Sequence, residues 1–213
     1  MSVTNTAKIL ATWLLIAALP LLFQRQASAL NMIGVGGVTF TDPQAEPPVA
    51  YHAQGTFGAG VFADFAFAPF LSLESGLLFM PRKYEAQSIS VDTEQSFTTL
   101  QFPVLVRLSP LDFLSVGIGP YFSLPIGTFK EVTRTKVGNA SVTVDRTFEQ
   151  AGIGTTELGL EASARIDWPV LPGIGAVLDL RYLHELTNSS TRTGVTLRFT
   201  ELQFLAGARV SLL

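Results

Sequence analysis

The sequence contains no cysteine, and only 15% of its 213 residues are Asp, Glu, Lys or Arg. Without cysteine the chain has no disulfide, no thiolate nucleophile, no cysteine metal ligand and no lipid-attachment cysteine. It carries two histidines, His52 and His184, and no HExxH, paired-carboxylate or phosphate-loop motif. We therefore expect no metal site and no cofactor.

A broad basic patch is also missing. Lys and Arg number 14 against 17 Asp and Glu, which gives a formal net charge of −3. Since nucleic-acid-binding proteins are marked by clustered positive charge, nucleic acid is not an expected partner.

The first 29 residues have the layout of a secretory signal peptide: Lys8, an apolar run over 9–23, and the small residues Ala-Ser-Ala at 27–29. The alternative is an N-terminal membrane anchor. The run is shorter than the roughly 20 apolar residues that a spanning helix needs. We expect residues 1–29 to be a cleaved signal peptide and residues 30–213 to form one domain.

No later segment offers an uninterrupted apolar run of membrane-spanning length, although 47% of the residues are hydrophobic. The apolar residues instead occupy every second position, which indicates β-strands with one apolar face. In "LDLRYLHELT" (178–187), Leu178, Leu180 and Tyr182 alternate with Asp179 and Arg181. The pattern runs through seven segments: 57–67, 71–79, 100–108, 114–126, 158–168, 174–182 and 202–212.

None of the positions on the apolar face of these segments is charged, whereas the opposite face carries five acids and four bases. An eighth strand is predicted at 32–40, "MIGVGGVTF". Its glycines leave it ambiguous which positions point outward and which point inward. The predicted connections alternate. Short, proline-marked turns follow 67, 108 and 168, and long polar loops cover about 41–56, 82–96, 128–155 and 186–199.

Alternating apolar strands with alternating short and long connections are typical of outer-membrane barrels, which place apolar side chains outside and polar ones inside. We predict an all-β fold: an eight-stranded antiparallel up-and-down transmembrane β-barrel in the cell outer membrane. Its expected partners are outer-membrane lipid and a protein or ligand outside the cell, and we expect a monomer. The alternative is a soluble lipocalin-like carrier with the same number of strands, which would require apolar side chains inside the barrel and charged side chains outside.

Three stretches resemble strands of the small porin-like outer-membrane β-barrels of the PorT type, found in Bacteroidetes-like bacteria. They are "LQFPVLVRLSP" (100–110), "VGIGPYFSLPIG" (116–127) and "LDLRYLHELTN" (178–188). The resemblance covers most of the chain after residue 29 and implies a fold more than an activity. Leu213 departs from the pattern, because a terminal phenylalanine is common at that position.

Eight strands enclose an interior just wide enough to be filled by side chains. We therefore predict an ion-pair network in the lumen, and a narrow ion-conducting channel is the alternative. The predicted network residues are Asp64, Glu74, Arg107, Glu161, Arg165, Asp179, Arg181 and Arg209. Two aromatic girdles are expected at the membrane interfaces, formed by Phe67, Phe70, Phe79, Tyr84, Trp168 and Tyr182.

An enzymatic function is the alternative hypothesis for the polar residues near His184. His184, Glu185 and the serines Ser189 and Ser190 could supply a serine–histidine–carboxylate set, and outer-membrane enzymes that act on lipid exist. The parity of His184, however, places it on the lipid face. We predict a protein that is not an enzyme.

The long loops are the expected site of specific function. Residues 130–148, "KEVTRTKVGNASVTVDRTF", alternate as a hairpin would, and 84–99 does likewise. We predict that the fifth and sixth strands, and also the third and fourth, extend beyond the membrane as a protruding sheet whose edge captures a partner strand. The alternative is a rigid surface loop. The residues assigned to this surface are Val132, Arg134, Lys136, Gly138, Asn139, Val142 and Val144.

Overall fold

The computed structural model describes residues 30–87, 90–136 and 140–212. The predicted signal peptide, residues 1–29, lies outside these ranges. Within them, no helix is long and apolar enough to cross a membrane. The elements are β1 (Leu30–Glu46), β2 (Tyr51–Ala53), β3 (Gly55–Ala68), β4 (Leu71–Gln87), β5 (Val91–Leu111), β6 (Leu114–Thr135), β7 (Ser141–Arg146), α2 (Phe148–Ala151), β8 (Glu157–Leu171), β9 (Ile174–Glu185) and β10 (Thr196–Leu212).

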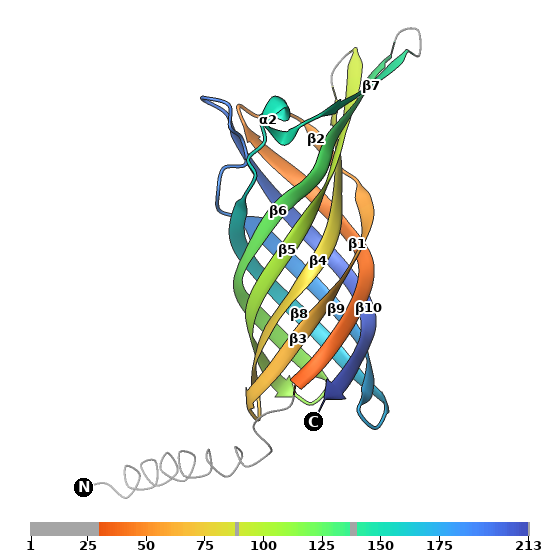
Figure 1. The fold of residues 1–213 in the computed structure, drawn as a ribbon, viewed down its shortest axis with the longest axis vertical. Coiled ribbons are helices and arrows are strands. Elements are labelled where there is room, and N and C mark those ends of the chain that lie inside the picture. The colour runs from red at the N-terminus through yellow and green to blue at the C-terminus, as the bar shows by residue number, and fades with distance from the viewer. Residues whose placement is uncertain (1–29, 88–89, 137–139, 213) are drawn as a thin grey trace, which may run out of the picture.

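Eight of the strands form a closed antiparallel ring in the order β1-β3-β4-β5-β6-β8-β9-β10 (Figure 1). The ring closes between the first and last strands, whose register runs from Leu30 opposite Leu212 to Glu46 opposite Thr196. Closure leaves no unpaired barrel edge, which a lipid environment could not hydrogen-bond. The prediction of an eight-stranded up-and-down barrel is confirmed.

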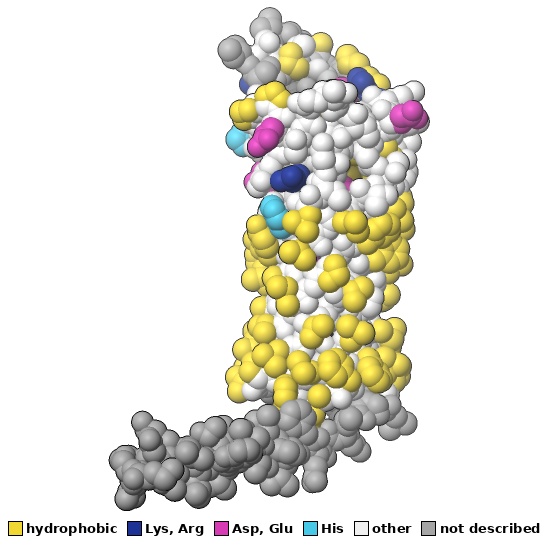
Figure 2. Space-filling view, turned by 90° about the vertical axis from the view of Figure 1, so that its left-hand side faces the viewer, with side chains coloured by type: hydrophobic (Ala, Val, Ile, Leu, Met, Phe, Trp, Pro, Cys, Tyr) yellow, Lys and Arg dark blue, Asp and Glu magenta, His cyan; other side chains and the backbone are white. Residues whose placement is uncertain are grey.

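The alternation along each strand decides which side chains face inward. On β9, Val177 is 2% exposed and Leu178 is 60% exposed, while Asp179 and Arg181 are buried. The same alternation exposes Phe57 on β3, Ile118 on β6 and Phe204 on β10. We call this outward apolar surface the apolar belt. On the face shown in Figure 2, hydrophobic side chains are spread over the lower and middle barrel wall, and the charged side chains lie above this part of the wall.

The two ends of the barrel differ. At the turn end, two-residue connections at 69–70, 112–113 and 172–173 join the strands, and the C-terminal end of β10 lies beside them (Figure 1). Gly173 adopts φ +76° in one of these turns, a conformation that glycine adopts without strain. At the opposite loop end, β2, β7 and α2 lie above the barrel (Figure 1).

The strands at the loop end continue well beyond the positions where the apolar belt stops. β4 runs to Gln87 and β5 begins at Val91, so most of the long loop expected at 82–96 is paired strand. This pairing confirms the predicted hairpin at 84–99, whereas the apolar segments alone ended the third strand at 79 and began the fourth at 100. Backbone pairing needs only a neighbouring strand, and the inward side chains of this region, such as Tyr84 and Phe97, are still buried.

The hairpin expected at 130–148 consists of the end of β6 and the separate strand β7, which pair from Phe129 opposite Arg146 to Arg134 opposite Ser141. The expectation that it would join the fifth and sixth barrel strands was wrong. The sixth barrel strand, β8, begins only after α2, whose capping box joins Thr147 to Gln150 and whose end is set by Gly152 in the left-handed conformation. We call the loop-end parts of β4, β5, β6 and β7 the protruding sheet.

Candidate functional site: the lumen and the loop end

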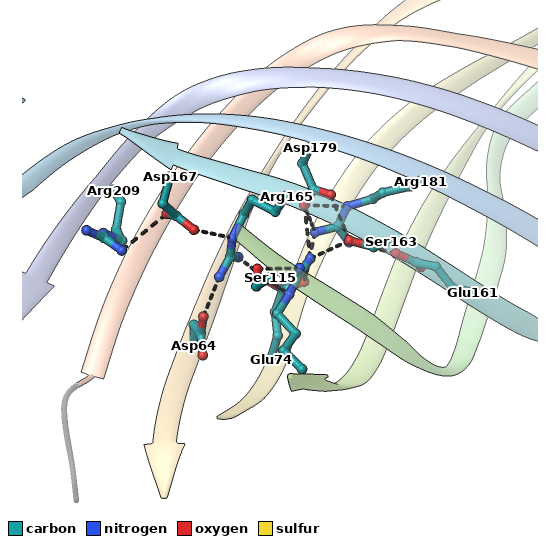
Figure 3. Close-up of polar contacts among 11 residues, drawn as sticks. Asp64, Glu74, Ser115, Glu161, Ser163, Arg165, Asp167, Asp179, Arg181 and Arg209 are labelled. Atoms are coloured by element: carbon teal, nitrogen blue, oxygen red, sulfur yellow. Dashed lines mark hydrogen bonds and ion pairs between the residues drawn. The ribbon is translucent and has the colours of Figure 1, made fainter. Parts of the chain in front are cut away.

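The lower lumen is filled by charged side chains that the alternation turns inward. Glu74 on β4 is the centre of the network and receives hydrogen bonds from Arg107 (2.7 Å), Arg165 and Arg181 (2.7 Å), which come from β5, β8 and β9 (Figure 3). Glu74, Arg107 and Arg181 are fully buried. Since an unpaired buried charge is very costly, the three guanidinium groups require this shared carboxylate together with further acids.

The remaining acids pair with the same three arginines, and Asp179 shares the Nη2 atoms of Arg107 and Arg181 with Glu74. Asp179 contacts Arg107 at 3.0 Å and Arg181 at 2.6 Å, and Glu161 contacts Arg181 at 2.7 Å (Figure 3). Asp64 on β3 accepts a hydrogen bond from Arg165. The network therefore connects strands that lie on opposite sides of the barrel.

Within the described part of the chain, Arg209 joins the network only through Asp167. Arg209 Nη1 lies 3.2 Å from Asp167, which also accepts from Arg165 Nε at 3.1 Å. Thus all eight predicted network residues lie in one connected group, which we call the ion-pair network. Asp167, Ser115 and Ser163 are further members that the site prediction omitted. The sequence could have indicated them, because they alternate with the outward apolar positions on β6 and β8 and therefore point into the lumen.

The lumen is not lined by polar residues throughout. Seven inward apolar side chains from β1, β3, β4, β9 and β10 form one cluster along one side of the interior: Ile33, Val35, Phe62, Leu78, Met80, Val177 and Leu205. The guanidinium of Arg181 lies 3.9 Å from the centroid of the Phe62 ring, which favours a cation–π contact. The predicted side-chain-filled polar lumen therefore describes only part of the interior, because apolar side chains also fill space where the barrel excludes water.

A second buried charged group lies nearer the loop end. Arg82 on β4 donates to Glu157 on β8 at 2.6 Å and to Glu201 on β10. Gln101 and Gln203 complete this upper cluster by hydrogen bonds to Glu201 at 2.8 and 3.0 Å. The sequence reading missed the cluster because Arg82, Glu157 and Glu201 lie just outside the segments in which alternation was recognised.

An aromatic cap covers the upper cluster. It consists of Tyr84, Phe97, Phe129, Ile153 and Phe199, with Tyr51, Phe148, Ala151 and Leu197 packed against them. Tyr84 is 1% exposed, so its assignment to an aromatic girdle was wrong. On β4 the odd positions face outward, and position 84 is even, which turns the ring into the lumen.

Four of the other predicted girdle residues point outward: Phe67 (46% exposed), Phe79 (48%), Trp168 (69%) and Tyr182 (49%). Phe67 and Trp168 lie near the turn end, and Phe79 and Tyr182 lie near the upper edge of the apolar belt. Phe70 lies in the turn between β3 and β4 and is half-buried.

The candidate catalytic set is not assembled. His184 and Glu185 are consecutive on β9 and point to opposite sides: His184 Nδ1 lies 3.4 Å from Thr200 Oγ1, whereas Glu185 is fully buried and accepts from Ser189 Oγ at 2.5 Å. Glu185 also accepts from the backbone N–H of Phe199. These contacts hold the 186–195 loop against the barrel. The imidazole of His184 lies on the other side of the strand, away from Glu185 and Ser189. Among the described residues, no group of three or more His, Cys, Asp or Glu could hold a metal ion.

The predicted surface residues that the structure describes lie on the protruding sheet. Val132 and Arg134 are on β6, Lys136 follows it, and Val142 and Val144 are on β7. Val142 is 60% exposed and Val144 38%. Ion pairs between Lys136 and Asp92 (3.0 Å) and between Lys83 and Glu94 (3.0 Å) tie the sheet together. Gly138 and Asn139 lie outside the described residues.

No protein-family model and no curated protein matches this sequence. The chain is similar to the solved structure of Ail, the attachment invasion locus protein of Yersinia pestis, with 11% identity over 84% of this chain and 97% of that chain and a TM-score of 0.44. It is similar to the outer membrane protein OprG from Pseudomonas aeruginosa, with 12% identity over 87% and 97% of the two chains and a TM-score of 0.46. For the outer membrane protease OmpT from Escherichia coli, the identity is 7% over 89% and 99%, and the TM-score is 0.49.

The class of the protein is defined by the barrel itself. A closed ring of eight antiparallel strands with an apolar exterior, a charged interior, short turns at one end and extended strands at the other is the arrangement of outer-membrane barrels. The chain is a β-barrel of the outer-membrane type.

Proposed function

We propose that the chain is an integral protein of the bacterial outer membrane that does not conduct and that acts through its loop end as a structural or surface-interaction protein. The observation that carries the proposal is the protruding sheet, in which, among the described residues, β7 pairs only with β6 and presents an unpaired strand edge beyond the apolar belt. A free edge can bind an extended segment of another protein by strand addition.

The membrane location is supported by the distribution of side chains. Large apolar residues such as Phe57, Ile118 and Leu178 point outward, while the arginines of the ion-pair network are buried. A soluble carrier of greasy ligands would require the reverse, with an apolar cavity inside and charges outside. Ring closure without a free barrel edge also supports a monomer.

A narrow channel is the second candidate, and the filled lumen argues against it. Side chains of the ion-pair network, the upper cluster and the aromatic cap occupy the lumen from the turn end to the loop end, and Arg82, Arg107 and Arg181 are 0% exposed. We expect purified protein in planar lipid bilayers to give no steady conductance steps. Reproducible open steps would contradict the closed lumen and support the channel.

The surface role is tested by deleting residues 132–145, which removes the tip of β6 and nearly all of β7. The barrel should still fold. Folding is judged on a gel, where a folded barrel that has not been boiled is compact and migrates faster than the same protein after boiling. A photo-reactive side chain placed at Thr143, which is exposed on β7, should form an adduct of discrete mass on intact cells. The same group at Asp112, in a turn-end connection, is the matched control. No adduct from Thr143, or the same adduct from Asp112, would argue against binding by the protruding sheet.

Two finer assignments belong to the same proposal. Membership of the PorT-type barrels is supported by the strand sequences at 100–110, 116–127 and 178–188. A non-enzymatic role is supported by the opposite facing of His184 and Glu185.

A further inference from the structure

The loop end contains a cavity of about 370 Å³ above the aromatic cap. Segments far apart in the sequence line it, including Pro48, Tyr51, Phe129, Ile153, Arg192 and Leu197. We call it the mouth pocket. Its size is at the lower end of the range of small-molecule sites, and its floor is the packed surface of the aromatic cap.

Arg192 brings a positive charge to the pocket that no acid neutralises within the part of the chain the structure describes. Its Nη2 donates to the carbonyl oxygen of Ala151 at 3.1 Å, and no described carboxylate lies within ion-pair distance of it. The lining acid, Glu131, is paired with Arg146 at 3.3 Å. The pocket therefore offers an uncompensated cation beside an apolar floor.

The position of Arg192 depends on Gly152. A Cβ at Gly152 would lie 2.6 Å from Arg192 Nε, and Gly152 has φ +74°, a conformation that L side chains rarely adopt. The absence of a side chain lets the guanidinium lie against the end of α2. The arginine is thus held at the pocket wall by the local backbone, since its hydrogen bond to Ala151 fixes one nitrogen and leaves the other donors available.

Tyr51 adds a neutral donor to the same pocket. Burial raises the pKa of Tyr51, and the nearby charge of Arg192 lowers it by a smaller amount. The hydroxyl is therefore protonated at neutral pH, and it has no hydrogen-bond partner among residues 30–87, 90–136 and 140–212. The guanidinium and the hydroxyl can both donate hydrogen bonds to one carboxylate group. The apolar floor can contact the apolar remainder of the same ligand.

We propose that the mouth pocket binds small organic carboxylates with an aromatic or aliphatic body, with the carboxylate at Arg192 and Tyr51 and the body on the aromatic cap. A single uncompensated charge suits a monoanion better than a multiply charged phosphate. The proposal rests on the proposed function only in that the loop end faces the outside of the cell.

The test uses 4-phenylbutyrate as the probe and the full mature chain in lipid nanodiscs. Isothermal titration calorimetry should detect saturable binding that empty nanodiscs lack. The neutral 4-phenylbutyramide, of the same shape, should bind at least tenfold more weakly. No heat above that of empty nanodiscs, or equal binding of acid and amide, would overturn the proposal.

Variants assign the binding to the pocket. Arg192→Gln should weaken phenylbutyrate binding at least tenfold and Tyr51→Phe about threefold, whereas Arg198→Gln, at an exposed arginine that does not line the pocket, should leave it unchanged. Val195→Trp should fill the pocket and abolish binding of acid and amide alike. Each variant must keep the unboiled fast-migrating band. Full binding by Arg192→Gln would refute the site.

Failure of this proposal can be told apart from failure of the proposed function. Nanodisc binding does not depend on which end faces the cell exterior, and the adduct from Thr143 does not depend on the pocket. A protein that binds phenylbutyrate but gives no adduct would support the pocket and contradict the surface role.

Discussion

Arg181 donates to Glu74 at 2.7 Å across the lumen, although their strands, β9 and β4, are four places apart in the eight-stranded ring. The two residues are 107 positions apart in the sequence. The same kind of contact joins Arg165 on β8 to Asp64 on β3. These contacts connect opposite walls, so the barrel is held both by its hydrogen-bond ladders and through its centre.

Glu74→Gln should strongly destabilise the barrel. The substitution removes the carboxylate shared by Arg107, Arg165 and Arg181 and leaves buried positive charge undercompensated, which we expect to lower the free energy of unfolding by about 3–5 kcal/mol. Urea unfolding in lipid vesicles, followed by loss of the unboiled fast-migrating band, measures the change. The matched control is Asp42→Asn, at an exposed residue with no ion pair among the described residues, and it should change stability little. Equal stability of both variants would mean that the network is dispensable.

Leu178→Arg tests whether the apolar belt meets lipid. Leu178 is 60% exposed near the middle of the outward positions of β9, and an arginine at the bilayer midplane of a barrel costs about 2–4 kcal/mol. Val170→Arg, at an exposed position near the turn end, should cost about 0–1 kcal/mol. Vesicle unfolding titrations give both values. If Leu178→Arg is neutral, or makes the protein soluble without detergent, the membrane location is wrong.

The absence of cysteine makes the orientation directly measurable. Single cysteines at Thr143, on β7, and at Asp112, in a turn-end connection, would be the only thiols of the chain. On intact cells, a membrane-impermeant maleimide should label Thr143→Cys and spare Asp112→Cys until the outer membrane is opened. The reverse pattern would show that the loop end faces the periplasm.

Trp168 gives a probe that needs no substitution. It is the one tryptophan after residue 29 and is 69% exposed at the lower part of the apolar belt. We expect blue-shifted emission that brominated lipids quench more strongly than acrylamide does, because the indole would lie in the membrane interface. Strong acrylamide quenching without lipid quenching would place the ring in water.

The sequence by itself determined the strands of the barrel and the facing of their side chains. Alternation at 57–67, 100–108 or 174–182 has a period of two, and since neither face can be exchanged without moving charge into lipid, the parity fixes inside and outside locally. It also selected all eight members assigned to the ion-pair network, because a charge within such a segment has no other direction to point.

Only the tertiary structure decided the pairings and the loop end. Which arginine reaches which carboxylate depends on ring closure and strand stagger, so the role of Glu74 as the shared acid and the link from Arg209 through Asp167 could not be read from spacing. Beyond the apolar belt the alternating signal fades. The upper cluster around Arg82 and the mouth pocket depend on neighbours more than 30 residues away in the sequence, and only the folded loop end shows that β7 is a strand separate from β8. Parity is a property of one strand, whereas these features belong to several strands at once.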